Sequence, residues 1–149
     1  MVKFSRILFP VDLSGIGEKI APYVRMMVDC HQAELVLLHV LDTSSSYRGM
    51  VEAYFDWDAL EAELRNSAEE KLAKIAGEIF QGLDGVGKAV LQGRPGQEIR
   101  DYAGQNRIDL IIMASHARKG LDYAFFGSVA HKVARNSQVP VLLINPSTV

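Results

Sequence analysis

Residues 33–41, AELVLLHVL, form an almost continuous apolar run, and this run decides the fold. A strand with one face in water alternates apolar and polar side chains, whereas a strand that is covered on both faces does not. Coverage on both faces is typical of parallel sheets that lie between two layers of helices. The run therefore predicts an inner strand of an α/β domain.

Four more segments have the composition of short strands, and helical patterns separate them. These strands are predicted at residues 3–11, 87–93, 109–114 and 139–145. Strands that alternate with helices along a chain form crossover connections and a parallel sheet. The 149 residues suffice for one domain and show no internal boundary. We therefore expect a single α/β domain, residues 1–149, with an open five-stranded parallel sheet and helices on both faces.

The segments between the strands carry apolar residues at helical spacing. Ile20, Val24 and Val28 recur every four residues, which predicts an amphipathic helix. Ser14 precedes this pattern and is the expected N-cap, because its hydroxyl accepts a hydrogen bond from a free backbone N–H. Further helices are predicted over residues 57–79, after Pro95 and over residues 128–136.

Residues 42–55, DTSSSYRGMVEAYF, follow neither pattern. A connection of this length is rarely a plain linker, so it is a candidate lid or contact surface. Tyr47, Tyr54, Phe55 and Trp57 gather around it. These aromatic side chains either cover the edge of the sheet or form a lid or partner surface.

Composition excludes several classes of function. The net charge of −2 gives no basic face for nucleic acid. No apolar run approaches the roughly 20 residues that a membrane span requires. The single cysteine, Cys30, excludes an internal disulfide and favours a reducing compartment, so we expect a cytoplasmic protein. The scattered histidines and the cysteine show no metal-ligand spacing, so we expect no metal site built from protein side chains.

Ligands of an open α/β sheet bind at the carboxyl ends of its strands. This rule selects four segments of the chain before any motif is considered. They are Pro10–Ser14, Val40–Asp42, Gln92–Arg94 and the loop that starts at Ala114.

Five stretches of the sequence, taken together and in order, resemble the universal stress protein family. They are ILFPVDLS near the start, LVLLHVLD, GRPGQEI, DLIIMASHARKGLDYAFFGSVAHKVAR and the terminal VPVLLINP. The resemblance implies a Rossmann-like sheet of order 3-2-1-4-5, of the adenine nucleotide alpha hydrolase type, and usually a dimer. Many members bind ATP through a motif of glycine, two residues, glycine, nine residues, then glycine with serine or threonine.

The spacing of this motif is intact in the chain, but two of its glycines are alanines. Ala114 and Ala117 stand at the first two positions, and Gly127 with Ser128 at the last. An alanine costs about 1–2 kcal/mol where the backbone must be left-handed, and otherwise adds only a methyl group. Because about 1.4 kcal/mol changes affinity tenfold, we expect weakened rather than abolished nucleotide binding.

The resemblance implies a site for ATP or ADP, with Mg²⁺ held mainly by phosphates and water. Asp12 would accept from adenine or ribose, and the first N–H groups of the helix at Ser128 would bind phosphate. Arg118 and Lys119 are further candidates to neutralise the phosphate charge. The expected nucleotide-binding residues are Pro10, Val11, Asp12, Val40, Met113, Ala114, Ala117, Gly127, Ser128 and Val129.

Plainer interpretations of the same residues stay open. Asp12 has the chemistry to bind backbone donors of the next segment, and Gly127 with Ser128 to form only a helix cap. His39, within a strand, is expected to be a hydrogen-bonded core residue. His116 is more consistent with a solvated loop residue than with a catalytic base.

Three functions are weighed against these residues. The first is a regulatory nucleotide-binding dimer of the stress response that is not an enzyme, with at most slow ATP hydrolysis, because no P-loop lysine pattern is evident. The second is a nucleotide-free dimerisation or interaction module. The third, a phospho-receiver domain, is excluded because Gln92–Gly93 and Asn145–Pro146 replace the aspartate and lysine that it requires.

Self-association follows from the implied strand order. The strand at 139–145 would lie at an edge of the sheet, and an exposed apolar edge pairs readily unless it is covered. The same strand of a second copy covers it symmetrically. We therefore expect a homodimer through residues 139–145, with a further protein partner whose identity the sequence does not indicate.

Overall fold

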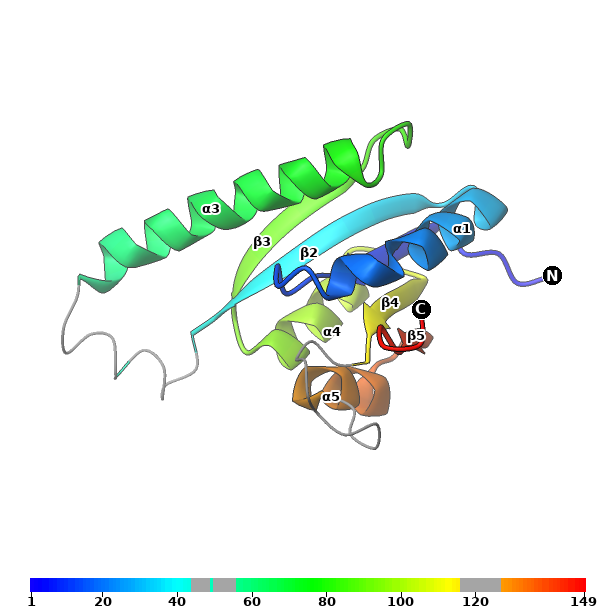
Figure 1. Ribbon diagram of the computed structural model, residues 1–149. Coiled ribbons are helices and arrows are strands. Elements are labelled where there is room, and N and C mark those ends of the chain that lie inside the picture. The colour runs from blue at the N-terminus through cyan, green and yellow to red at the C-terminus, as the bar shows by residue number, and fades with distance from the viewer. Residues whose placement is uncertain (44–48, 50–55, 116–126) are drawn as a thin grey trace.

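A five-stranded parallel sheet of order β3-β2-β1-β4-β5 forms the centre of the computed structural model (Figure 1). The structure describes residues 1–43, 49, 56–115 and 127–149. The strand order that the family resemblance implies is confirmed, and so is the α/β class. The strands are β1 (Arg6–Pro10), β2 (Glu34–Asp42), β3 (Gly87–Gly93), β4 (Leu110–Ala114) and β5 (Val141–Ile144).

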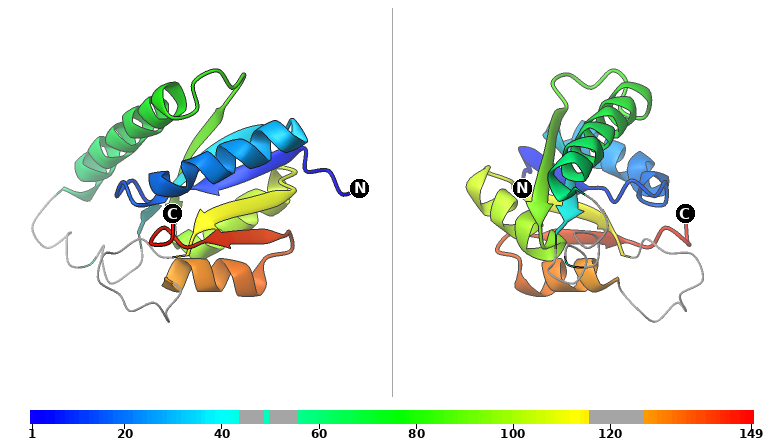
Figure 2. Two further views of the ribbon diagram at one scale, coloured as in Figure 1. Left: turned by 45° about the vertical axis from the view of Figure 1, so that its right-hand side comes forward. Right: turned by 90° about the vertical axis from the view of Figure 1, so that its left-hand side faces the viewer.

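Helices cover both faces of this sheet, as expected (Figure 2). One face packs against α1 (Ala21–His31) and α3 (Trp57–Glu78), and the other against α4 (Pro95–Gln105) and α5 (Ser128–Asn136). A short 3₁₀ turn, η1 (Gly17–Ile20), precedes α1. Among the described helices, none combines the length and the apolar composition that a bilayer crossing requires.

The inner strands supply side chains to both layers of the core. In β2, Leu35 and Leu37 join the cluster under α1 and α3, whereas Val36 and Leu38 join the cluster under α4 and α5. All four are at most 2% exposed. The prediction that the apolar run at residues 33–41 is an inner strand, covered on both faces, is therefore confirmed.

The start of the first helix differs from the prediction. Ser14 is not its N-cap, because η1 lies between Ser14 and α1. The positive φ angles of Leu13 (63°) and Gly15 (84°) turn the chain sharply here. The Ser14 hydroxyl donates to Asp12 Oδ1 at 2.7 Å and accepts from the N–H of Ile16 at 3.3 Å. The predicted apolar stripe is confirmed, since Ile20, Val24 and Val28 are all buried.

The long helix α3 extends beyond the sheet at its N-terminal end (Figure 1). Leu72 and Ile75 are buried over the sheet, but Leu64 is 36% exposed. Trp57, at the start of the helix, is only 7% exposed, which supports the covering role for this aromatic residue. Tyr47, Tyr54 and Phe55 lie outside the described residues, so the choice between cover and lid stays open for them.

Candidate functional site

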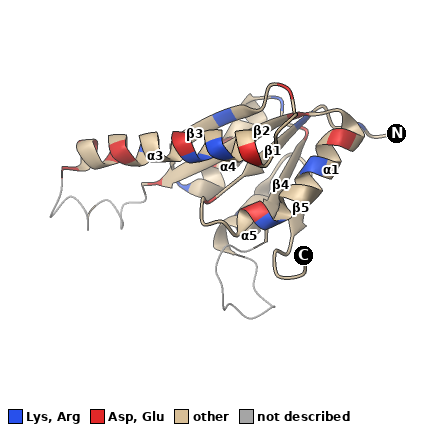
Figure 3. Cartoon of the chain, turned by 45° about the horizontal axis from the view of Figure 1, so that its top comes forward, with Lys and Arg blue, Asp and Glu red and all other residues tan. Residues whose placement is uncertain are grey.

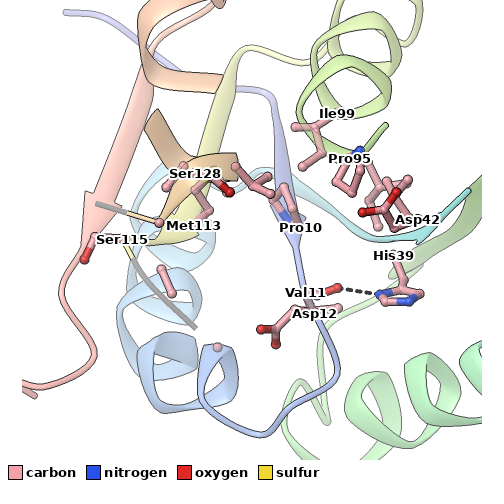
Figure 4. A pocket seen from close by; sticks show the side chains of 17 residues that line it. Pro10, Val11, Asp12, His39, Asp42, Pro95, Ile99, Met113, Ser115 and Ser128 are labelled. Carbon is pink, nitrogen blue, oxygen red and sulfur yellow. Dashed lines mark hydrogen bonds between the residues drawn. The ribbon is translucent and has the colours of Figure 1, made fainter. Parts of the chain in front are cut away.

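A cavity of about 480 Å³ lies at the carboxyl ends of β1, β2 and β4, beside the first residues of α4 and α5 (Figure 4). Strand ends and helix starts meet here because every strand of the sheet runs in the same direction. Ala117 lies outside the described residues. The other nine predicted site residues all line the cavity: Pro10, Val11, Asp12, Val40, Met113, Ala114, Gly127, Ser128 and Val129.

The N-terminus of α5 forms one end of this cavity. Gly127 is the N-cap residue, and the first intrahelical bond is donated by the N–H of His131 to its carbonyl at 2.9 Å. The N–H groups of Ser128, Val129 and Ala130 therefore have no partner within the helix, and such groups bind anions well. This arrangement is suited to a phosphate.

The N–H of Gly127, unlike those of the three residues that follow it, already has a partner. Its N–H donates to the carbonyl of Ser115 at 2.6 Å, and this bond holds the start of α5 against the end of β4. Ser115 is 5% exposed and its own N–H donates to Ile144 of β5 at 2.9 Å. The donors that this end of the cavity offers are thus the N–H groups after Gly127, together with the Ser128 hydroxyl.

Asp12 makes the local hydrogen bonds of the plainer interpretation, and it also lines the cavity. Its Oδ1 accepts from the N–H of Ser14 at 3.0 Å and from the Ser14 hydroxyl, so the carboxylate does satisfy a donor of the next segment. Among the described residues, no donor is bonded to Oδ2. The side chain is exposed and lines the cavity, so Oδ2 offers an acceptor to a ligand.

His39 is hydrogen-bonded, as expected, but it also lines the cavity. Its Nδ1 lies 2.8 Å from the carbonyl oxygen of Val11. A carbonyl only accepts, so Nδ1 carries the hydrogen and, in the neutral ring, Nε2 is an acceptor. The β1–β2 contact thereby fixes the tautomer of a side chain at the edge of the site.

Ala114 stands where the family motif has its first glycine. It is the last residue of β4, and it is not among the described non-glycine residues with positive φ. The backbone here needs no glycine, so the substitution adds only a methyl group to the cavity wall.

Several lining residues were not predicted individually. Asp42 ends β2, Pro95 and Ile99 come from the start of α4, and Ser115 follows β4. Asp42 lies in one of the four segments that the strand-end rule selected, whereas residues 92–94 line none of the described cavities. Instead, α4 reaches the site directly after this segment, a position that no local pattern in the sequence reveals.

The charge of the described lining is negative. Asp12 and Asp42 contribute carboxylates, and no lysine or arginine is among the described residues that line the cavity. The walls are otherwise mostly apolar, with Met113 6% exposed and Val11 5% exposed. A flat, partly apolar ring system with hydrogen-bond donors and a short anionic tail matches this combination.

Comparison with known proteins agrees with this architecture. The family model described as the universal stress protein family matches residues 3–145. Universal stress protein MJ0577 of Methanocaldococcus jannaschii is 29% identical over 155 residues, which cover 96% of each chain. Universal stress protein YxiE of Bacillus subtilis is 30% identical over 152 residues, which cover 95% of this chain and 99% of YxiE.

Solved structures share the fold. The structure of MJ0577 superposes with a TM-score of 0.80 at 30% identity and covers 97% of both chains. The universal stress protein of Archaeoglobus fulgidus in complex with dAMP has a TM-score of 0.61 at 19% identity, over 97% of this chain and all of that one. The match spans nearly the whole sequence and the strand order agrees, so this chain belongs to the universal stress protein family.

Proposed function

We propose that the protein is a regulatory dimer that binds ATP or ADP in the cavity between β1, β2, β4 and α5. One observation carries the proposal: a single cavity has free helix N–H groups at one end and hydrogen-bond acceptors at the other. Its volume of about 480 Å³ falls within the range of about 300–1,000 Å³ that is typical of small-molecule sites.

The geometry favours one orientation of the nucleotide. The phosphates lie against the N–H groups of Ser128 and Val129, where the helix dipole also favours negative charge. The base then lies among Pro10, Val40 and Asp12 at the opposite end. Mg²⁺ is held by the phosphates and water, since the described residues contain no cluster of three metal-ligating side chains.

Family membership adds support. The Archaeoglobus fulgidus universal stress protein, which has this fold, forms a complex with dAMP, an adenine nucleotide. We carry this ligand class over to the present chain because the nine described site residues gather around one cavity here.

We propose binding rather than catalysis as the role of the nucleotide. Rapid phosphoryl transfer depends on cations that stabilise the charge of the transferring group. The described lining provides carboxylates and hydroxyls but no lysine or arginine. Hydrolysis of ATP is therefore expected to be slow at most, and nucleotide occupancy to act as a signal to a protein partner.

The edge strand β5 is the proposed dimer contact. It is the last strand of the sheet, next to β4, and Leu142 on it is 37% exposed. Pairing with β5 of a second copy would cover this apolar edge and satisfy its free backbone groups.

A nucleotide-free interaction module is the second candidate, and two observations favour it. The methyl group of Ala114 lines the cavity, and the N–H of Gly127 is already bonded to Ser115. Both reduce what the site offers to a phosphate.

Calorimetric titration with ATP and Mg²⁺ distinguishes the two candidates. The nucleotide proposal predicts saturable heat with a Kd in the micromolar range, that is about −8 kcal/mol. GTP serves as the control, and it should bind more weakly because its base carries a carbonyl where adenine has an amine. Absence of heat at millimolar ATP would leave the interaction module as the function.

A further inference from the structure

A second cavity of about 340 Å³ adjoins the proposed nucleotide cavity. The two share four lining residues, Asp12, His39, Val40 and Asp42. These residues come from the ends of β1 and β2, so the junction lies at the carboxyl edge of the sheet. A substituent on a ligand in the first cavity would have to pass these four side chains to reach the second.

The far wall of the second cavity belongs to the N-terminal half of α3. Trp57, Glu61 and Leu64 line it, one turn apart along the helix. The Trp57 indole Nε1 donates to Glu61 Oε2 at 3.2 Å, which holds the carboxylate beside the ring. Leu64 is 36% exposed and forms the open side. The wall thus combines an aromatic surface, a fixed carboxylate and an aliphatic side chain.

The second cavity is acidic. Asp12, Asp42 and Glu61 line it, and the described lining contains no lysine or arginine. Acidic residues also predominate on the half of α3 that lies beyond the sheet (Figure 3). Arg65 does not line the cavity, and its guanidinium donates instead to the carbonyl of Val90 at 2.9 Å and to Gln92 Oε1 at 3.2 Å. A positively charged group fits this environment.

The position of the base relative to the junction follows from the anion site. Ser128 lies on one side of Pro10 and His39 with Asp42 on the other (Figure 4). With the phosphates at Ser128, the base is the part of the nucleotide that reaches the junction. The junction side chains are acceptors, namely the carboxylates and Nε2 of the His39 ring, so they favour the exocyclic amine of adenine.

We propose that the second cavity binds a substituent on the exocyclic amine of adenine, and that the preferred substituent is a flexible chain with a positive charge. The ligand class is thus the N6-substituted adenine nucleotides, with the chain passing Asp12 and Asp42 and its cation at Trp57 and Glu61. This inference rests on the proposed nucleotide function, since the base must first occupy the neighbouring cavity.

Three probes test the proposal by calorimetry on the full chain: ATP, N6-(6-aminohexyl)-ATP and 8-(6-aminohexyl)amino-ATP, each with Mg²⁺. The N6 derivative should bind about fivefold more tightly than ATP, from one ion pair and one cation–π contact. The C8 derivative carries the same charge on the other edge of the base and should not gain affinity. An N6 derivative that binds no more tightly than ATP, or a C8 derivative with the same gain, overturns the proposal.

Two variants connect the gain to the cavity. Glu61→Gln removes the charge at constant size and should abolish the gain of the N6 derivative while the affinity for ATP stays unchanged. Glu63→Gln, an exposed neighbour on α3 that does not line the cavity, should retain the gain. If no probe gives binding heat, ATP included, the nucleotide function is refuted as well. Binding of ATP without the N6 gain refutes only the second cavity's role.

Discussion

Asp12 illustrates how one side chain serves both structure and ligand. Its Oδ1 accepts from the backbone N–H and the hydroxyl of Ser14, its Oδ2 has no described donor, and the residue lines the cavity. In the proposed complex, one oxygen of the carboxylate would serve the local turn and the other the ligand. A substitution that changes only one of them tests this division.

Asp12→Asn should weaken ATP binding and leave the fold intact. The amide keeps a carbonyl oxygen for Ser14 but presents an N–H₂ group in place of the second acceptor. Loss of a charged hydrogen bond costs about 1.5–3 kcal/mol, which corresponds to a roughly 10- to 100-fold rise in Kd. Asp29→Asn, on α1 and outside the cavity, is the matched control. Unchanged ATP affinity in Asp12→Asn would show that the carboxylate is only a cap.

Ala114→Gly should tighten ATP binding by less than about tenfold, because the variant removes a methyl group without relieving a left-handed backbone. Titration of the variant beside the parent chain measures this change. A gain of a hundredfold or more would mean that the bound state needs a backbone conformation that only glycine adopts easily.

At the scale of elements, the sequence predicted every described strand and the starts of α3, α4 and α5, and among these elements it missed only the start of the first helix. The run at 33–41 agrees with β2 because burial on both faces leaves a direct mark on composition. The strand at 87–93 agrees with β3, although β3 lies at the edge of the sheet and none of its residues is fully buried. The prediction that Ser14 caps the first helix was wrong, because the residue type alone indicates an N-cap, whereas the turn here depends on the φ angles of Leu13 and Gly15. Trp57 and Asp42 approach each other only through the packing of α3 on β2, which no short pattern records.

The edge strand β5 carries a prediction about assembly. Leu142→Glu places two equal charges close to the symmetry axis of the proposed dimer, and their repulsion opposes pairing. The variant should therefore be a monomer by size-exclusion chromatography and light scattering, whereas the parent chain should be a dimer. Met26→Glu, on the exposed face of α1, is the control and should stay dimeric. A parent chain that is monomeric at tens of micromolar would rule out the β5 contact.

Across the whole molecule, charge and cavity shape combine to define the ligand. Every described lysine and arginine lies outside the lining of the nucleotide cavity, while two carboxylates lie within it. In the proposed complex, the α5 amides and a metal ion would neutralise part of the triphosphate charge. Arg118 and Lys119, the cations predicted for the same role, lie outside the described residues. This pairing of carboxylates could not be predicted from the sequence, because Asp12 and Asp42 are distant in the chain and approach each other only after folding.

Removal of Mg²⁺ should therefore discriminate between nucleotides. With a chelator present, ATP is expected to lose about tenfold or more in affinity, whereas AMP, with its smaller charge, should change little. Paired titrations with and without the metal measure the difference. Equal effects on ATP and AMP would indicate that the metal acts on the protein rather than on the phosphates.

The central claim is that the cavity between β1, β2, β4 and α5 holds an adenine nucleotide with its phosphates at α5. A crystal structure of the protein grown with ATP and Mg²⁺ tests it most directly. The account predicts purine density between Pro10 and Val40, with a phosphate oxygen in hydrogen-bond distance of the Ser128 or Val129 N–H. Density for protein side chains or a rearranged turn in that space, with no nucleotide, would contradict it.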